Sequence, residues 1–319
     1  MRAAIYHDAQ VLLEERPAPM PMAGQILVRV HASALNRADI LQRKGNYPAP
    51  SGWPADIGGL EYAGAVEALG PDVTRWKVGD RVMGLVGGGG HAEYVAVHQD
   101  EALAVPAPLS WSDAAAIPEA FLTAWDALTT RGHLQRGERV LLHAAGSGVG
   151  TAAVQIARQL GATVLGTSRS AEKLVRLKGL GLDVGIDTSA RGFREQIADP
   201  VDLIVDPLGA PALPDNLALL APLGRLVLLG FLQGSLAKEV ELGLILRKRL
   251  TVVGTVMRAR SLEERRAIAG EYRDHLRPLF ERGLLKPVVG AVVPMLDIAA
   301  AHATMEKNET FGKVVLTWA

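Results

Sequence analysis

The chain contains no cysteine among its 319 residues. Disulfide bonds, thiolate nucleophiles and cysteine-ligated zinc or iron–sulfur sites are therefore excluded. A net charge is also lacking, because 34 lysines and arginines balance 34 aspartates and glutamates. A neutral chain has no overall field that attracts nucleic acid or an anionic membrane surface, so we expect neither as a partner and expect small molecules instead.

Long apolar segments are missing as well. The first residues, MRAAIYHDAQ, contain no hydrophobic region of a signal peptide, and no run of 18 or more apolar residues occurs anywhere. We therefore expect a cytoplasmic protein. The length of the chain is large for a single core and is typical of two domains.

The N-terminal third reads as short strands separated by glycine and proline, which predicts a small mainly-β domain. The clearest strand segments there are QILVRVHAS, YAGAVEALG, DRVMGLV and AEYVAV. The run of four glycines at 87–90 is expected to form a flexible turn.

Apolar strands then alternate with amphipathic helical segments, which predicts an α/β domain with a doubly wound parallel sheet covered on both faces. The last segment is too short for a third core, so we expect it to pack on the first domain. We predict a discontinuous first domain, 1–117 with 261–319, and a dinucleotide-binding domain, 118–260. The strands expected in the latter are RVLLHA, ATVLGTS, VGID, VDLIVD, GRLVLLG and LTVVGT.

The segment HAAGSGVG joins the first of these strands to a helix. Pyrophosphate binds at such a place, because backbone N–H groups point at it from the helix N-terminus and small residues let the chain come close. The strict Gly-x-Gly-x-x-Gly pattern is absent, since Ala145 and Ser147 hold the first two glycine positions, but both are small. We take Ser147, Gly148 and Val149 as candidate cofactor contacts; the alternative is a turn that only packs.

The residues after the second strand bear on the choice between NAD and NADP. Ser168 lies 18 residues after Gly150, close to the position about 20 residues on where NAD-binding chains place an acid. Ser168, Arg169 and Lys173 offer a hydroxyl and two cations, which suit the 2′-phosphate of NADP. The pattern predicts NADPH as the cofactor; the alternative is an ordinary solvated helix start.

Five stretches occur in order along nearly the whole chain: ALNRADILQRKGNYP, GLEYAGAVEALG, AAIPEAFLTAWDAL, HAAGSGVGTAAVQIARQLGATVLGTSRSAEK and GKVVL. Together they resemble the zeta-crystallin and quinone oxidoreductase family, part of the zinc-independent medium-chain dehydrogenases/reductases. The resemblance implies a GroES-like mainly-β catalytic domain, a Rossmann domain, and hydride transfer from NADPH to a quinone. Two alternatives stay open, an enone or alkenal (enoyl) reductase and a non-catalytic NADPH-binding protein of crystallin-like or RNA-binding type.

The same resemblance argues against a metal. Zinc-dependent members of the wider superfamily hold zinc with a cysteine and a histidine, where this chain has Asn36 and Leu60, although Glu61 is retained. An amide and a leucine do not make a tetrahedral zinc site, so we expect none. Without a Lewis acid, an already conjugated acceptor such as a quinone or an enone suits the hydride best.

By resemblance, Asn36 and Tyr47 lie on the segment that faces the nicotinamide. We expect both to be catalytic, as hydrogen-bond donors to the acceptor oxygen, and Asn36 also to contact the cofactor. A tyrosine with the ordinary pKa of about 10 is protonated at neutral pH and can donate; the alternative for Tyr47 is a surface tyrosine. Leu41 stands where several relatives carry another tyrosine.

The resemblance also implies further contacts. Thr123 matches a residue that meets the nicotinamide carboxamide, while Gly230 and Phe231 end the fifth Rossmann strand. His143 is expected to be structural. The strand LTVVGT reads as a sheet edge, which is a liability if left unpaired. The resemblance implies that two copies pair through such strands, so we expect a homodimer. Three more cofactor candidates, for which plain loop or strand-end roles are equal alternatives, are Thr188, Asn308 and Lys313.

Overall fold

The computed structural model describes residues 1–318 and divides them into two compact units. One unit holds residues 1–122 and 257–318, and the other holds Thr123–Val256. The predicted fold class is confirmed, including the discontinuous mainly-β domain; the domain bounds drawn from the sequence stay a prediction. No helix within residues 1–318 is long and apolar enough to cross a bilayer.

The Thr123–Val256 unit is built on a six-stranded sheet in which all paired strands are parallel. The spatial order is β10-β9-β8-β11-β12-β13, so the order reverses between β8 and β11. Ligands of such sheets bind outside the carboxyl ends of the strands at this switch point. The strands are β8 (Arg139–Leu142), β9 (Thr163–Ser168), β10 (Val184–Asp187), β11 (Val201–Asp206), β12 (Leu220–Leu228) and β13 (Thr251–Gly254).

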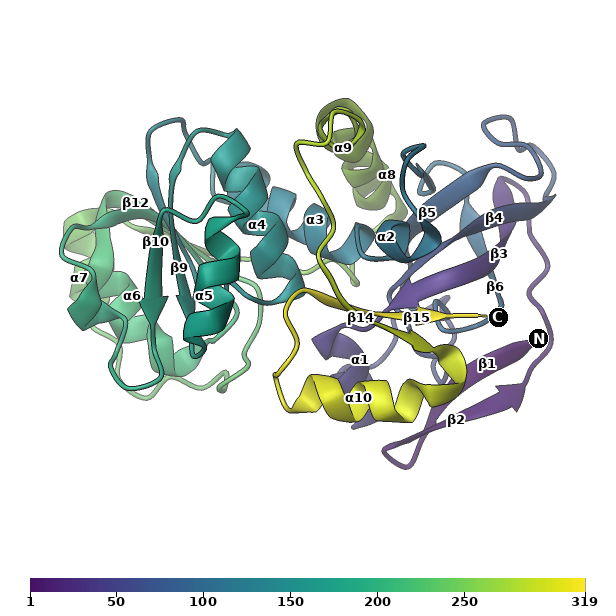
Figure 1. The fold of residues 1–319 in the computed structure, drawn as a ribbon, viewed down its shortest axis with the longest axis horizontal. Coiled ribbons are helices and arrows are strands. Elements are labelled where there is room, and N and C mark those ends of the chain that lie inside the picture. The colour runs from purple at the N-terminus through teal and green to yellow at the C-terminus, as the bar shows by residue number, and fades with distance from the viewer. Residues whose placement is uncertain (319) are drawn as a thin grey trace. The chain divides into compact units, whose positions relative to one another are not determined.

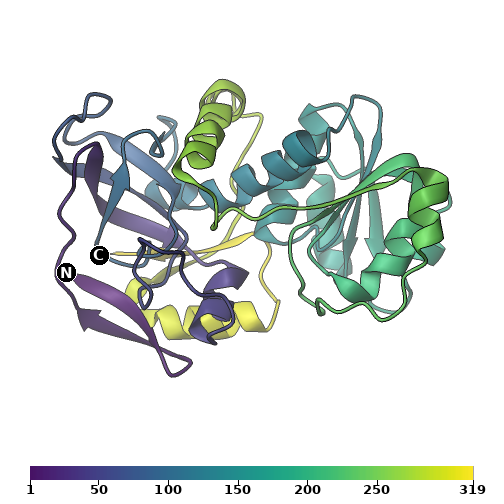
Figure 2. The ribbon, with the colours of Figure 1, turned by 180° about the vertical axis from the view of Figure 1, so that it is seen from behind.

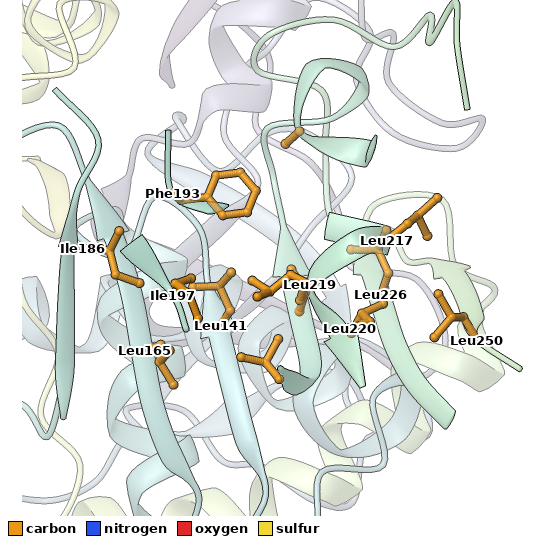
Figure 3. Close-up of a cluster of buried hydrophobic side chains, with 13 residues drawn as sticks. Leu141, Leu165, Ile186, Phe193, Ile197, Leu217, Leu219, Leu220, Leu226 and Leu250 are labelled. Atoms are coloured by element: carbon orange, nitrogen blue, oxygen red, sulfur yellow. The ribbon is translucent and has the colours of Figure 1, made fainter. Parts of the chain in front are cut away.

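Helices cover both faces of this sheet, with α4 and α5 on one face and α6 and α7 on the other (Figure 1). A buried apolar cluster from the strands and from the segments after β10 and β11 fills the layer beneath α6 and α7 (Figure 3). Burial of such side chains is the main source of stability, at about 25 cal/mol per Å². The helices are α3 (Pro118–Trp125), which enters the unit, α4 (Gly148–Gln159), α5 (Ala171–Lys178), α6 (Leu213–Leu219) and α7 (Leu242–Lys248).

The other unit contains a seven-stranded sheet and a separate two-stranded hairpin, β1–β2. The sheet order is β14-β15-β3-β4-β5-β7, and β6 also pairs with β3. Most pairs are antiparallel, as expected for the short alternating strands of the sequence. The strands are β1 (Arg2–His7), β2 (Gln10–Glu15), β3 (Gln25–Ala34), β4 (Glu61–Leu69), β5 (Arg81–Leu85), β6 (Tyr94–His98), β7 (Leu103–Ala104), β14 (Val289–Pro294) and β15 (Lys313–Thr317).

The C-terminal segment completes this unit, because β15 pairs antiparallel with β3. Figure 2 shows the last helix, α10, alongside α1 and the β1–β2 hairpin. Ser110 begins α2 with a capping box in which its hydroxyl accepts the N–H of Asp113 at 3.1 Å. The helices are α1 (Arg37–Arg43), α2 (Trp111–Ala115), α8 (Leu262–Glu271), α9 (Arg277–Glu281) and α10 (Ile298–Glu306).

The four glycines at 87–90 form bends and a turn, as expected, but they are buried and closely packed rather than exposed. A Cβ on Gly87 would lie 2.4 Å from Trp53 Cδ1, and one on Gly90 would lie 2.5 Å from the Glu61 carbonyl oxygen. The Gly87 carbonyl also accepts from Arg258 Nε at 2.7 Å. Glycine permits close packing as well as flexibility, and close packing is the reason for glycine at these positions.

Candidate active site

A buried ion pair joins Lys313 of β15 to Glu61 of β4. The distance from Lys313 Nζ to Glu61 Oε1 is 2.7 Å, and the two side chains are 6% and 0% exposed. The same ammonium group donates to Leu35 O at 3.0 Å and to Asn36 Oδ1 at 2.6 Å. All three N–H bonds of Lys313 are therefore used within this cluster. Its predicted contact with the cofactor stays a prediction.

Asn36 lies immediately before α1 and is held from two sides. Its Nδ2 donates to Glu61 Oε1 at 2.9 Å and to Ala34 O at 3.2 Å. An amide has only two N–H bonds, so donation to an acceptor, as expected from the sequence, requires one of these to break. In this arrangement Asn36 orders the cluster.

The second oxygen of the Glu61 carboxylate points to the start of α3. Glu61 Oε2 accepts the backbone N–H of Glu119 at 2.8 Å, in the first turn of that helix. Helix N-termini favour negative charge, because their first N–H groups have no partner inside the helix. Glu61 thus has three donors to its two oxygens, from Asn36, Lys313 and Glu119.

Glu119 brings a second carboxyl group to the same place, and its side chain is partly exposed. Burial raises the pKa of Glu119 to about 8, with the negative charge of Glu61 adding to the rise and the Lys313 ammonium opposing it. Two neighbouring carboxyl groups do not readily ionise together, and Glu61 has the donors that stabilise a charge. Glu119 therefore retains its proton at neutral pH.

Tyr47 lies on the loop after α1, which Arg258 holds in place. Arg258 is 7% exposed, and its Nη1 donates to Tyr47 O at 2.8 Å while its Nη2 donates to Gln42 Oε1 at 2.7 Å. The guanidinium carbon also lies 5.0 Å from the centroid of the Tyr47 ring. Burial raises the pKa of the Tyr47 hydroxyl, with a further rise from Glu119, so this hydroxyl is protonated at neutral pH.

Asp39 fixes the start of α1 and with it the position of Asn36. Its two oxygens accept the backbone N–H groups of Asn36 at 2.7 Å and Gly59 at 3.0 Å. Gly59 has φ +95°, and a Cβ there would lie 2.4 Å from His91 N, so this position requires glycine. Asp39 is fully buried, and burial raises its pKa.

The glycine turn lies at the carboxyl end of β8. Ser147 begins α4, and its hydroxyl accepts the N–H of Gly150 at 3.0 Å, so the hydroxyl hydrogen stays available to a ligand. A Cβ on Gly150 would lie 2.5 Å from Ala145 O, so the turn can close only around glycine. Gly148 and Val149 form the first turn of α4 and present N–H groups at its N-terminus.

A buried polar chain holds this turn from beneath. His143 Nε2 lies 2.8 Å from Asn216 Oδ1, and Asn216 Nδ2 donates to Asp206 Oδ2 at 3.0 Å. On the other side, His143 Nδ1 lies 3.1 Å from Thr167 Oγ1, which accepts the N–H of Ala144 at 3.3 Å. His143 is thus part of a buried hydrogen-bonded chain that links the ends of β8, β9 and β11, and its expected structural role stays a prediction.

The candidates for the adenosine phosphate lie at the ends of β9 and β10. Ser168 O accepts the N–H of Thr188 at 2.9 Å, so these two residues are brought together. Ser168 Oγ accepts the N–H of Ser170 at 3.1 Å and can still donate. Arg169 is exposed, and Lys173 lies in the first turn of α5. Their contacts with a phosphate stay predictions.

Thr123 lies in α3, and its Oγ1 is buried without a hydrogen-bond partner among residues 1–318. A buried hydroxyl of this kind needs a partner, which a ligand would supply. Gly230 and Phe231 follow β12, with the Phe231 side chain 57% exposed. Asn308 has φ +60°, and its Oδ1 accepts from Arg37 Nη2.

Comparison with known proteins supplies the family. Residues 22–107 match an alcohol dehydrogenase GroES-like domain, and residues 148–270 match a zinc-binding dehydrogenase. The synaptic vesicle membrane protein VAT-1 homolog of Rattus norvegicus is 33% identical over 331 residues, which cover 96% of this chain and 80% of that protein. The chain belongs to the medium-chain dehydrogenase/reductase superfamily. Members of this superfamily bind nicotinamide cofactors, and membership supports an oxidoreductase.

Three solved structures share the fold over almost the whole of this dehydrogenase/reductase. An NAD-dependent alcohol dehydrogenase has a TM-score of 0.87 at 29% identity, covering 99% of both chains. The CurK enoyl reductase has 0.86 at 29%, covering 100% of this chain and 99% of the other. The quinone oxidoreductase of Coxiella burnetii has 0.81 at 27%, covering 99% and 98%. An alcohol, an enoyl group and a quinone appear in these names, so the acceptor has to be argued from this chain's own residues.

Residues 148–270 match a zinc-binding dehydrogenase, so we ask whether the side chains of this dehydrogenase/reductase could bind a zinc ion. Within residues 1–318 no three histidine, cysteine, aspartate or glutamate side chains are placed together to hold a metal ion. Leu60 is buried, and the Asn36 amide oxygen accepts from the Lys313 ammonium. The donor set does not fit a tetrahedral zinc site, and an ammonium group already supplies the local positive charge.

A nicotinamide nucleotide does fit the residues of the Thr123–Val256 unit. Ser147 with its free hydroxyl hydrogen, the α4 N-terminus and the unpartnered hydroxyl of Thr123 are features that such a ligand would satisfy. These residues could be named from the sequence and the resemblance, whereas Glu119, Arg258 and Asn216 could not. The one available signal for Glu119 was a lone acid in the apolar stretch AAIPEAF, which is equally typical of a helix start.

Proposed function

We propose that this chain is an NADPH-dependent quinone oxidoreductase of the zeta-crystallin type that works without zinc. The observation that carries the proposal is the cluster around Glu61, in which the Lys313 ammonium and the Asn36 amide both bind the Glu61 carboxylate and bind each other. The similarity to the Coxiella burnetii quinone oxidoreductase supports the same reaction.

The absence of a fitting metal-ligand set within residues 1–318 favours acceptors that need little polarisation. When bound, a reduced nicotinamide supplies a hydride, and a conjugated acceptor spreads the resulting negative charge onto oxygen. Donors such as the Tyr47 hydroxyl and the Glu119 carboxyl stabilise that charge. Both are protonated at neutral pH, because burial raises the pKa of each.

The cofactor assignment rests on residues of the Thr123–Val256 unit. Ser147, Gly148 and Val149 would hold the pyrophosphate, and Thr123 would hold the carboxamide. Ser168, Arg169 and Lys173 would hold the 2′-phosphate, which makes NADPH the preferred nucleotide. Thr188, Gly230 and Phe231 would line the strand ends that the nucleotide crosses.

The test is direct. Purified protein is mixed with NADPH or NADH and a small benzoquinone, and the near-ultraviolet absorbance of the reduced nucleotide is followed. We expect rapid loss of absorbance with NADPH and slower loss with NADH, each dependent on quinone and above the uncatalysed rate. No oxidation of either nucleotide with any quinone or enone would contradict the proposed enzyme.

An enone or enoyl reductase is the second candidate, and the similarity to the CurK enoyl reductase favours it. It would use the same nucleotide and the same donors. The same assay with an α,β-unsaturated ketone and an enoyl thioester in place of the quinone compares the two by kcat/KM.

A cytoplasmic location and the lack of a nucleic-acid partner stay predictions of the sequence.

A further inference from the structure

The Glu119 carboxyl differs from the rest of the cluster around Glu61. Among residues 1–318, its side chain forms no hydrogen bond or ion pair within the chain, although its backbone N–H is bound by Glu61 Oε2 at 2.8 Å. The side chain is partly exposed. A partly exposed acid whose backbone is bound by a buried carboxylate, and whose own oxygens have no partner among residues 1–318, is available to a ligand.

We propose that Glu119 is the proton donor of the reduction, giving the proton of its carboxyl O–H to the acceptor after hydride has arrived. This inference rests on the proposed function and adds to it a catalytic residue. The hydride carries two electrons, so the nucleotide is oxidised and the acceptor is reduced by two electrons. The O–H bond of Glu119 breaks, an O–H bond forms on the acceptor oxygen, and the carboxylate left behind regains a proton from water.

The surroundings of Glu119 keep a proton on it until the acceptor is charged. Glu61 on β4 and Asp39 on α1 place negative charge near it, while Lys313 on β15 and Arg258 place positive charge. Burial and Glu61 dominate, and they raise its pKa to about 8. An acid with a pKa near the working pH is the kind that general acid catalysis needs.

The other polar groups of the cluster are committed. Lys313 uses its three N–H bonds on Leu35, Asn36 and Glu61. Asn36 uses both of its N–H bonds on Ala34 and Glu61. Neither has a proton to give without breaking a buried contact.

Tyr47 is the competing donor. The negative charge that Glu119 acquires once it is ionised raises the pKa of the Tyr47 hydroxyl, so the two groups lie in one electrostatic environment. The two differ in acidity, because burial and Glu119 raise the pKa of Tyr47 above its usual value of about 10, whereas that of Glu119 is about 8. Glu119 is the stronger acid, and its carboxylate can exchange with water because the side chain is partly exposed. Tyr47 is then a hydrogen-bond donor that binds the acceptor oxygen.

The experiment compares Glu119→Gln and Tyr47→Phe with the wild type, and uses Glu67→Gln as the matched control. Glu67 is an exposed glutamate on β4 of the same unit. kcat/KM is measured from about pH 6 to about pH 10 with a quinone and with an enone. The infrared carbonyl band of a protonated carboxyl is followed over the same range in the nucleotide-free proteins, as wild type minus Glu119→Gln.

We expect wild-type kcat/KM to fall as the pH rises through about 8, because only the protonated acid is active. Glu119→Gln should lose roughly 10²–10⁴-fold in kcat with the enone and should show no such fall. The loss should be smaller with the quinone, because its reduced anion is a weaker base and needs the proton less. Tyr47→Phe should keep the fall while raising KM, and Glu67→Gln should match the wild type.

The infrared band separates the outcomes. A band that is present in the wild type near neutral pH, lost above about 8 and absent in Glu119→Gln supports the proposal. An unchanged rate and pH profile in Glu119→Gln, or a Glu119 that is already ionised at neutral pH, overturns it. If the wild type oxidises no nucleotide with any acceptor, the proposed function fails, whatever the infrared band shows about Glu119.

Discussion

Lys313 and Glu61 form a buried ion pair in which both partners are fully hydrogen-bonded. The N–O distance is 2.7 Å, the side chains are 6% and 0% exposed, and Asn36 bridges them. Buried charges are costly unless each is paired, so removal of one partner leaves the other as an unpaired charge buried away from water. The pair also joins β15, near the C-terminal end of the chain, to β4 of the N-terminal segment.

Lys313→Met should therefore lower the free energy of unfolding by about 3–5 kcal/mol, measured by urea or thermal unfolding. Adding Glu61→Gln to this variant should recover part of the loss, because no unpaired charge then remains buried. Glu281→Gln is the control, since it breaks an exposed pair with Arg277 at 2.7 Å and should cost less than about 1 kcal/mol. Equal stabilities of Lys313→Met and Glu281→Gln would contradict the structural role.

The strands of the parallel sheet could be predicted because their sequences admit few alternatives. RVLLHA and VDLIVD are near-continuous apolar runs bounded by turn residues, and they become the adjacent central strands β8 and β11. The Ser147 turn could be placed for the same reason, since it follows such a strand directly. The local sequence pattern suffices to predict a strand and its turn where one segment contains both the buried apolar residues and the turn residues.

The cluster around Glu61 could not be predicted in this way, because its geometry depends on distant segments. Glu119 follows Glu61 by 58 residues and Lys313 follows Asn36 by 277. In the sequence, Glu119 is an acid at a helix start and Lys313 a cation before a strand, each typical of a solvated position. The pairing of β4 with β3 and of β3 with β15 brings Glu61 and Lys313 together, and the start of α3 brings Glu119 to Glu61.

The buried histidines supply a prediction on pH. Tyr6 Oη lies 3.3 Å from both His91 Nδ1 and His302 Nε2. Burial lowers the pKa of His91 to about 3 and that of His302 to about 4 in the folded chain, whereas an unfolded histidine titrates near 6.5. Between about pH 6.5 and 4 the unfolded state binds more protons, so the free energy of unfolding falls as the pH is lowered.

His302→Gln should be less stable than the wild type at neutral pH but should lose less stability on acidification. Between about pH 6.5 and about 4, the wild type should lose roughly 3 kcal/mol more free energy of unfolding than His302→Gln. Urea unfolding at several pH values measures this difference and the slope of the free energy of unfolding against pH for each protein. His7→Gln removes a histidine that is 73% exposed and should leave the slope unchanged. A His302→Gln slope equal to that of the wild type would show that this histidine does not titrate as proposed.

Preference for NADPH is tested at the end of β9. Arg169→Asp and Lys173→Ala should each raise the Kd for NADPH about tenfold or more, because each would remove a charge-assisted contact that we propose with the 2′-phosphate. The Kd for NADH should change by less than about twofold, as NADH lacks that phosphate. Lys178→Ala, at the other end of α5, is the control. Nucleotide fluorescence titration gives all these values, and equal losses for both nucleotides would contradict the assignment.

The last prediction concerns the edge strand of the parallel sheet, β13. Within residues 1–318, β13 is hydrogen-bonded only to β12, and Val252 on it is 39% exposed. An apolar strand with free backbone groups invites pairing with another strand, and a second copy of β13 would supply one in a homodimer. Sedimentation at micromolar concentration should give the mass of a dimer for the wild type. Val252→Lys should give a monomer with unchanged circular dichroism, because a lysine on an edge strand opposes pairing, whereas Val78→Lys, at a position 62% exposed in the other unit, should remain dimeric. A Val252→Lys dimer would show that the dimer contact lies outside β13, and a wild-type monomer would show that no such contact forms.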